Sequence, residues 1–326
     1  MNPSVIPMPI AAQRRFDVTL AGDANLDLIL YGLPEDLPPE RELLASEMQL
    51  HLGGSAAITA HNLAALGNSV GLISTNAGDH FASFCQMELV RAGVELSRCV
   101  PKRHTTTGVT VLVQNRDFRR MLTYPGATFH LDFDSLDLEY LSDSRHFHLS
   151  SYYLQRALTP RIPELFASLK QAGLTISLDP NDDPDCAWNR GILEALRFVD
   201  ILMPNEREVC LLAGEPDLNR AIAALTEIVP LLIVKRGADG ASAHTATRSW
   251  QVASQPVKVV DAVGAGDSFN AGFLHAWLRG WTIEEALAHG NLTGAWSTTA
   301  AGGTSAFRDA QMLSELESAW NHALEL

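Results

Sequence analysis

The segment from Asp261 to Leu274 constrains the fold and the chemistry of this chain more than any other. It reads DAVGAGDSFNAGFL and connects a β-branched run, Val257–Val260, to a run with apolar residues at helical spacing. Aromatic residues at every fourth position of that second run predict a helix over Asp267–Arg279. Small residues between a strand and a helix let backbone N–H groups approach an anion closely, and the helix dipole favours negative charge there. The sequence therefore predicts an anion-binding turn at a strand-to-helix junction.

This turn also carries a carboxylate, Asp267, directly after Gly264, Ala265 and Gly266. A negative charge at this position would repel a bound phosphate, so phosphate binding alone does not account for it. It is useful if the carboxylate takes the proton from an alcohol that attacks the phosphate. A glycine-rich turn with an aspartate near the helix start is also a common structural feature. A further aspartate at the start of the segment, Asp261, favours the functional interpretation, which is phosphoryl transfer to a hydroxyl.

The same segment resembles the C-terminal signature of the ribokinase-like carbohydrate kinases, the PfkB family. The resemblance implies ATP as the phosphoryl donor, with Mg²⁺ on its phosphates. It implies that Asp267 is the catalytic base and that the amides of Gly264, Ala265 and Gly266 form an anion hole. In that family the first aspartate of the motif often helps hold a monovalent cation, for which K⁺ is expected. The implied cation-site residues are Asp261, Val263 (through its carbonyl), Gly303 and Ser305.

Strand-like runs alternate with helical runs along most of the chain. Such alternation predicts an α/β fold with a mainly parallel central sheet and helices on both faces, and the resemblance implies the ribokinase-like version of it. The expected strands are Phe16–Ala21, Val70–Ser74, His146–Ser150, Thr175–Leu178, Ile201–Met203, Leu231–Val234 and Val257–Val260.

Two stretches, about 28–50 and 104–125, interrupt this alternation. The second contains a predicted hairpin, Val109–Gln114 and Arg119–Thr123. The family has a small β lid built from such insertions, so we expect the two stretches to pair into a lid over the sugar. A lid would keep water from the phosphoryl donor, and its exposed edge offers a route to a homodimer. The predicted organisation is an N-terminal tail and one kinase domain, residues 1–15 and 16–326.

Polar residues after the first strand are the candidates for binding the acceptor. Asn25 and Asp27 follow that strand, and short polar side chains at the carboxyl end of a strand can hold the hydroxyls of a polyol, although they are also ordinary turn residues. The resemblance implies that Asp27 binds the substrate, with Asn25 as a further candidate. It also implies that Gly53 and Gly54 precede a helix beneath the sugar, a helix that Ser55 is expected to cap.

The chain departs from the family pattern at two positions. The family commonly has an asparagine where this chain has Ile58, which indicates a less hydroxylated or differently oriented acceptor. Asn62 lies one helical turn later and either compensates or is a surface residue. After Asp179-Pro180-Asn181 the family often has a basic residue, but this chain has Asp182, so we assign no phosphate-binding arginine there.

Asn205 and Glu208 are candidates for the nucleotide-binding part of the site, because they match an Asn-x-x-Glu motif of the family. The family uses this motif to organise the metal and water shell around the phosphates, and two oxygen-bearing side chains acting through water suit Mg²⁺. The same residues also make a capped helix start, which is sufficient by itself. Further nucleotide contacts implied by the resemblance are Lys235, Gly237, Gly240 and Asn291.

Composition excludes several other classes of protein. The net charge is −14, and the sequence has no basic cluster that could neutralise the phosphates of nucleic acid. No apolar run approaches the length of a membrane span. The four cysteines are scattered, which argues against a zinc or redox site and fits the reduced thiols of a cytoplasmic protein. The sequence contains neither a Walker-type loop nor a Gly-x-Gly-x-x-Gly after the first strand.

The sequence thus predicts ATP-dependent phosphorylation of a sugar or sugar-like alcohol. A nucleoside kinase of the adenosine type with the same fold is one alternative, because Ile58 would suit an apolar pocket for a purine. A non-catalytic sensor of sugars or nucleotides on a kinase fold is another, although the retained Asp267 argues against it.

Overall fold

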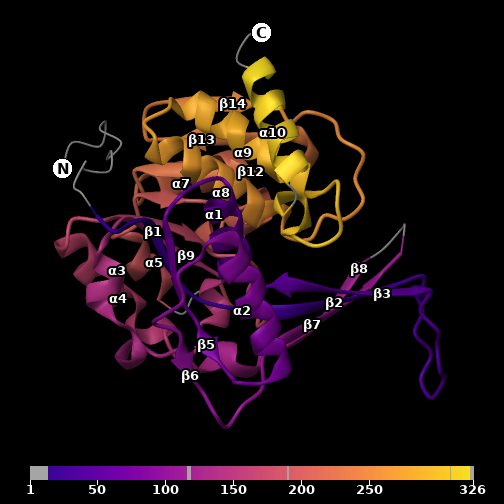
Figure 1. The fold of residues 1–326 in the computed structure, drawn as a ribbon. Helices are drawn as coiled ribbons and strands as arrows, with labels where there is room; N and C mark the ends of the chain where they lie inside the picture. The colour runs from indigo at the N-terminus through magenta and orange to yellow at the C-terminus, as the bar shows by residue number, and fades with distance from the viewer. Residues whose placement is uncertain (1–13, 116–118, 189–190, 309, 324–326) are drawn as a thin grey trace.

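The computed structural model describes residues 14–115, 119–188, 191–308 and 310–323. Within these residues an eight-stranded sheet forms the centre, in the order β14-β13-β12-β11-β10-β9-β1-β4 (Figure 1). The strands from β12 to β4 pair in parallel, and β13 and β14 add an antiparallel edge. The mainly parallel sheet is confirmed. Its strands are β1 (Phe16–Ala21), β4 (Val70–Ile73), β9 (Ser144–Ser150), β10 (Thr175–Asp179), β11 (Ile201–Leu202), β12 (Leu231–Lys235), β13 (Ala241–His244) and β14 (Ser249–Val252).

Alternating apolar residues bury both faces of this sheet. In β12, Leu231 and Ile233 belong to one apolar cluster, whereas Leu232 and Val234 belong to a second one. The first cluster is completed by α1 (Ser55–Ala65), α2 (His80–Ala92), α8 (Ala265–Leu278) and α9 (Ile283–Ser297). The second is completed by α3 (Leu138–Ser142), α4 (Ile162–Gln171), α5 (Ile192–Leu196), α6 (Glu206–Ala213) and α7 (Leu218–Thr226).

The last helix, α10 (Ala310–Ala323), packs beside α9, outside the two main clusters. It lies near the top of Figure 1. None of the helices in the described ranges is long and apolar enough to span a membrane.

A second sheet with the order β3-β2-β7-β8 projects from the main body (Figure 1). Its strands are β2 (Asn25–Tyr31), β3 (Glu47–Gly53), β7 (Val109–Gln114) and β8 (Arg119–Tyr124). Parallel pairing of β2 with β7 joins the two stretches that interrupt the alternation in the sequence, with Leu28 opposite Val111. The first stretch becomes β structure at Asn25, three residues earlier than expected. A two-stranded pair, β5 (Thr75–Asn76) and β6 (Val100–Pro101), lies apart from both sheets.

The prediction of a strand at Val257–Val260 is wrong. These residues form an irregular, solvent-facing segment between β14 and α8, and Val259 and Val260 are 60% and 52% exposed. Their β-branched side chains favour extended backbone, but β propensity alone does not provide a neighbouring strand to pair with. The edge of the sheet on this side is instead β14, whose hairpin with β13 has weak sequence signals because β13 reads Ala-Ser-Ala-His.

Candidate active site

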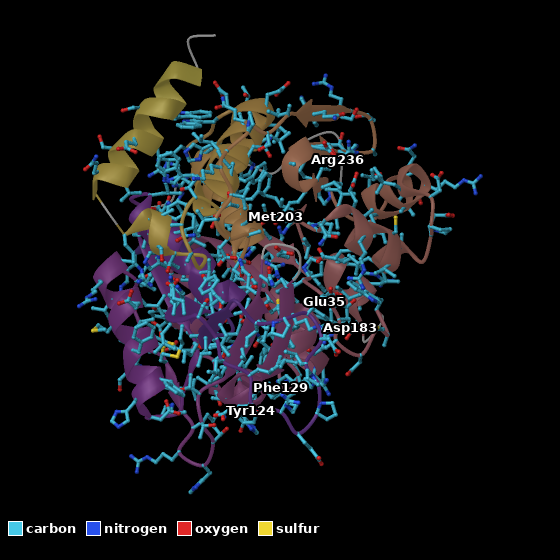
Figure 2. The ribbon with its side chains drawn as sticks, turned by 90° about the vertical axis from the view of Figure 1, so that its right-hand side faces the viewer. Glu35, Tyr124, Phe129, Asp183, Met203 and Arg236 are labelled. Atoms are coloured by element: carbon cyan, nitrogen blue, oxygen red, sulfur yellow. The ribbon has the colours of Figure 1, made fainter. Side chains whose placement is uncertain are left out.

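The site lies where strand ends of the central sheet meet the first turns of α1 and α8. Parallel strands bring their carboxyl ends to one edge, so residues distant in sequence converge there. Figure 2 views the molecule from the side that carries the projecting sheet. Tyr124 and Phe129 lie in its lower part, Arg236 lies near the top, and Met203 and Asp183 lie between them.

Asp267 lies in the first turn of α8 and is 7% exposed. The helix begins at Ala265, two residues earlier than expected, after Gly264 in the left-handed conformation with φ of 70°. Burial, and then the nearby Asp179, raise the pKa of Asp267 well above its usual range, whereas the nearby Lys235 acts in the opposite direction. The structure therefore holds a carboxyl group of raised proton affinity at a helix N-terminus.

A buried ion pair joins Lys235, at the end of β12, to Asp179, at the end of β10. The Asp179 side chain is 1% exposed and also accepts a hydrogen bond of 2.6 Å from Asn270 Nδ2. A Cβ on Gly266 would lie 3.4 Å from Lys235 Nζ, so the ammonium group lies beside the glycine turn. Lys235 thus places one positive charge near Asp267.

The aspartate Asp261 connects the start of the turn to the loop before α10. Its carboxylate oxygens accept hydrogen bonds from the backbone N–H of Val263 at 3.0 Å and of Gly302 at 2.9 Å. The predicted cation ligands Val263, Gly303 and Ser305 are therefore near one another in space. The Ser305 hydroxyl lies 3.3 Å from His51 Nδ1, so β3 also touches this loop. The described residues contain no cluster of three or more His, Cys, Asp or Glu side chains suited to a metal.

Two residues of α1, Ile58 and Asn62, support the turn from behind. Ile58 is 3% exposed and packs against Gly264 and Gly303. Asn62 is fully buried and donates hydrogen bonds to Ser268 Oγ at 2.9 Å and to the Gly303 carbonyl at 3.0 Å. Of the two alternatives given for Asn62, a surface residue is therefore wrong. Because α1 packs directly on α8, the Asn62 side chain reaches Ser268 on that helix.

Asp27 is a buried carboxylate with no hydrogen-bond or ion-pair partner among the described residues. It lies on β2, is 6% exposed, and contacts Gly53 so closely that a Cβ there would lie 2.2 Å from Oδ1. Burial, followed by the charges of Asp23 and Asp261, raises the pKa of Asp27 to about 7. The neighbouring Asn25 has a partner, because its Oδ1 accepts a hydrogen bond of 2.7 Å from the Thr128 hydroxyl. A buried polar group without a partner is where a ligand group is expected.

Helix α1 is capped by Asp23, which the sequence analysis did not single out. Its carboxylate accepts hydrogen bonds from the backbone N–H of Ser55 and of Ala56, at 3.0 and 3.1 Å. The expected Ser55 cap is wrong, since Gly54 is the N-cap residue with φ of 89° and Ser55 is the first helical residue. An aspartate from another segment, more than thirty positions away, gives no local capping signal. The Ser55 hydroxyl instead accepts a hydrogen bond of 3.1 Å from Asn181 Nδ2.

Asn205 and Glu208 form a complete capping box at the start of α6. The Asn205 side chain accepts from the Glu208 N–H at 3.0 Å, and Glu208 Oε2 accepts from the Asn205 N–H at 2.9 Å. Burial and the nearby Asp179 raise the pKa of Glu208 to about 7. Glu208 Oε1 forms no hydrogen bond within the described part of the chain, and a carboxylate oxygen of this kind fits the water shell of Mg²⁺.

The remaining nucleotide candidates are close to the β12–β14 region. Gly237 and Gly240 both have positive φ, and a Cβ on Gly240 would lie 2.1 Å from the Val252 carbonyl. Asn291, on α9, donates a hydrogen bond of 2.9 Å to that same carbonyl. Through these contacts Gly240 and Asn291 hold β14 in place. This structural role is sufficient to explain both residue types even if neither residue contacts a nucleotide.

The chain is similar to known kinases along almost its whole length. The sequence profile of the pfkB family carbohydrate kinases matches residues 16–310. An ATP-dependent ribose-1-phosphate kinase of Halopiger xanaduensis is 32% identical over 298 residues, which cover 89% of this chain and 94% of that protein. A fructokinase of Salmonella typhimurium is 29% identical, with 89% of this chain and 95% of that protein covered.

A solved structure has the same fold. A putative ribokinase II of E. coli, in complex with ATP and Mg²⁺, superposes with a TM-score of 0.82 at 26% identity, over 93% of this chain and 98% of that one. The ribokinase-like fold expected from the sequence is thereby confirmed. With the family profile covering most of the chain, the protein belongs to the pfkB family of carbohydrate kinases.

Proposed function

We propose that this protein transfers the γ-phosphoryl group of ATP to a hydroxyl of a sugar or sugar-like alcohol, with Asp267 as the base. The observation that carries the proposal is the buried Asp267 in the first turn of α8, with Lys235 beside it. The acceptor oxygen forms a bond to the γ-phosphorus while the bond from that phosphorus to the bridging oxygen breaks and ADP leaves. The hydroxyl proton passes to the Asp267 carboxylate, whose raised pKa makes it a better proton acceptor.

The glycine turn and Lys235 account for the charge that develops during transfer. The N–H groups of Gly264 and Gly266 would donate to the equatorial oxygens, because the first N–H groups of a helix have no partner within the helix. The Ala265 N–H, which donates to the Ala262 carbonyl at 3.4 Å, would exchange that partner for a phosphoryl oxygen. Lys235 adds a positive charge next to Gly266. When bound, Mg²⁺ supplies neutralisation of the donor phosphates, and Glu208 with Asn205 are the residues that would hold its water shell. A K⁺ ion held near Asp261 and the Val263 carbonyl remains a further prediction.

Asp27, Gly53 and Gly54 are proposed to bind the acceptor. The unpartnered Asp27 carboxylate would accept hydrogen bonds from acceptor hydroxyls, which satisfies a group that burial otherwise penalises. Gly53 leaves the space that the Asp27 side chain needs. The second sheet, β3-β2-β7-β8, carries Asp27 and is proposed as the lid that excludes water from the donor.

The test is ADP release with a panel of pentoses, hexoses, sugar acids and nucleosides, at fixed ATP and Mg²⁺. An acceptor-dependent rise with a sugar supports the proposal, and a rise with nucleosides alone would favour the adenosine-type alternative. If no alcohol raises ADP release above the acceptor-free level, the sensor alternative is favoured. Protein carrying Asp267→Asn, purified in the same way, controls for contaminating kinases.

We further propose that the outer face of the lid sheet joins two copies of the chain. Cross-strand register places Leu50, Leu28, Val111 and Leu122 in one apolar row, and Leu50 and Leu122 are 40% and 58% exposed. An apolar row without charges is complementary to itself, as a two-fold interface requires. Light scattering should find a dimer that Leu122→Asp converts to a monomer. Met121→Asp, on the opposite face of β8, should leave the dimer intact, and a monomeric wild type would refute the interface.

A further inference from the structure

A cavity of about 220 Å³ lies beneath α10, away from the turn of Asp267. Its walls come from α8, α9, α10 and the residues around the end of α1, and they include Trp281, Trp320, Leu313, Leu316, His275 and His289. We call it the α10 cavity. The two tryptophan rings stack at 5.0 Å with 5° between their planes, and the two imidazoles stack at 5.2 Å. His289 also contacts Trp320 edge to face.

The hydrogen bonds around His275 fix which of its ring nitrogens carries the proton. Arg279 donates to Asn68 Oδ1 at 2.7 Å, and Asn68 Nδ2 donates to the Leu63 carbonyl at 2.7 Å, so the amide orientation of Asn68 is set. The same Nδ2 lies 3.0 Å from His275 Nδ1, which must therefore accept. The proton of the neutral ring is on Nε2, which is a donor.

His289 has the opposite arrangement. Its Nδ1 lies 2.8 Å from the carbonyl oxygen of Gly272, and a carbonyl only accepts, so Nδ1 carries the proton and Nε2 is an acceptor. Burial lowers the pKa of His289, and burial with the charge of Arg279 lowers the pKa of His275 to about 3, so both rings are neutral near pH 7. Neither Nε2 atom has a hydrogen-bond partner in the described ranges, and His289 is only 5% exposed.

We propose that the α10 cavity binds a neutral, flat nitrogen heteroaromatic molecule of one or two rings. The stacked tryptophan and leucine side chains provide flat and apolar contact area, and the two Nε2 atoms offer one donor and one acceptor to a ring that carries both. An engineered apolar cavity of about 150 Å³ binds benzene, so the larger volume here has room for two fused rings. Charged molecules are excluded because the two neutral imidazoles offer no counter-charge.

Three probes of equal size separate shape from hydrogen bonding. Benzimidazole carries a donor and an acceptor, indole carries a donor only, and indene carries neither. Binding to the full-length protein is measured by calorimetry, with ADP and Mg²⁺ present so that the nucleotide site is occupied. The expected order of affinity is benzimidazole, then indole, then indene. Absence of saturable binding, or equal affinity for benzimidazole and indene, would overturn the proposal.

Two variants locate the binding. Leu316→Trp fills the cavity and should weaken benzimidazole about tenfold or more, whereas Leu193→Trp on the exposed side of α5 should not. His289→Phe keeps a ring of similar size but removes the acceptor nitrogen, so it should weaken benzimidazole and remove the preference for indole over indene. Thermal melting of each variant establishes that it is folded, and His289→Phe tests the site if the larger substitution disturbs α10. Unchanged binding in both variants would place the molecule elsewhere and refute the assignment.

Discussion

Replacing Asp27 by asparagine should stabilise the free protein while it impairs acceptor binding. The pKa of Asp27 is raised to about 7 by burial and by its aspartate neighbours, so the folded state penalises the ionised form. As pH rises from the ordinary aspartate pKa toward 7, folding stability is lost, and above pH 7 the loss is complete. Each pKa unit corresponds to about 1.4 kcal/mol, so the loss is about 2 kcal/mol at pH 5 and about 4 kcal/mol at pH 8.

Asparagine keeps the shape of the side chain but cannot ionise, so it removes this pH-dependent loss. Urea unfolding without ligands should therefore find Asp27→Asn more stable than the wild type, by about 2 kcal/mol at pH 5 and about 4 kcal/mol at pH 8. Asp134→Asn is the control, because its side chain is 83% exposed and its removal should change stability by no more than about 0.5 kcal/mol. In steady-state kinetics Asp27→Asn should raise the KM for the acceptor and leave that for ATP unchanged.

The reasoning is refuted if Asp27→Asn is no more stable than the wild type at pH 8, or if its advantage is the same at both pH values. Either result would mean that the Asp27 carboxylate has a partner or is hydrated in the free protein. An increase in stability together with an unchanged acceptor KM would keep the electrostatic argument but remove Asp27 from the acceptor site.

Two further substitutions test the turn and its ion pair. Gly264→Ala places a Cβ 2.6 Å from Gly303 Cα at a φ of 70°, so turnover should fall at least about tenfold. Gly173→Ala is the control, because Gly173 has a φ of 87° but open space around it. This control should lose only about 1 kcal/mol of stability and no activity. Equal effects of the two would contradict the packing argument. Lys235→Met leaves Asp179 buried without its cation and should lower the free energy of unfolding by about 3–5 kcal/mol, measured in urea. Lys170→Met, which removes a more exposed partner of Asp200, should cost less and leave turnover unchanged.

The sequence is sufficient to predict the elements whose patterns are local. The strand bounds of β1 and β7 agree with the expected ones, because the hydrophobic period changes clearly at their ends. The glycine turn before Asp267 is likewise visible, since left-handed backbone at Gly264 favours glycine. The assignment of the two inserted stretches to one sheet is also confirmed by the pairing of β2 with β7.

What the sequence does not predict depends on contacts between distant segments. Val257–Val260 has strand-forming residues but pairs with no strand of either sheet. Asp23 caps a helix in another segment, and Asn62 reaches Ser268 and Gly303 across the interface between α1 and α8. The role of Asp179 as the partner of both Lys235 and Asn270 likewise follows only from the order of strands in the sheet.

The central claim, that Asp267 takes the acceptor proton, is tested most directly by single-turnover phosphoryl transfer in Asp267→Asn. Asparagine keeps the size of the side chain and cannot accept the proton, so the rate should fall by about 10²–10⁴-fold, while calorimetry finds the affinity for ATP changed by less than about tenfold. A variant that binds ATP and transfers the phosphoryl group within about threefold of the wild-type rate would contradict the account.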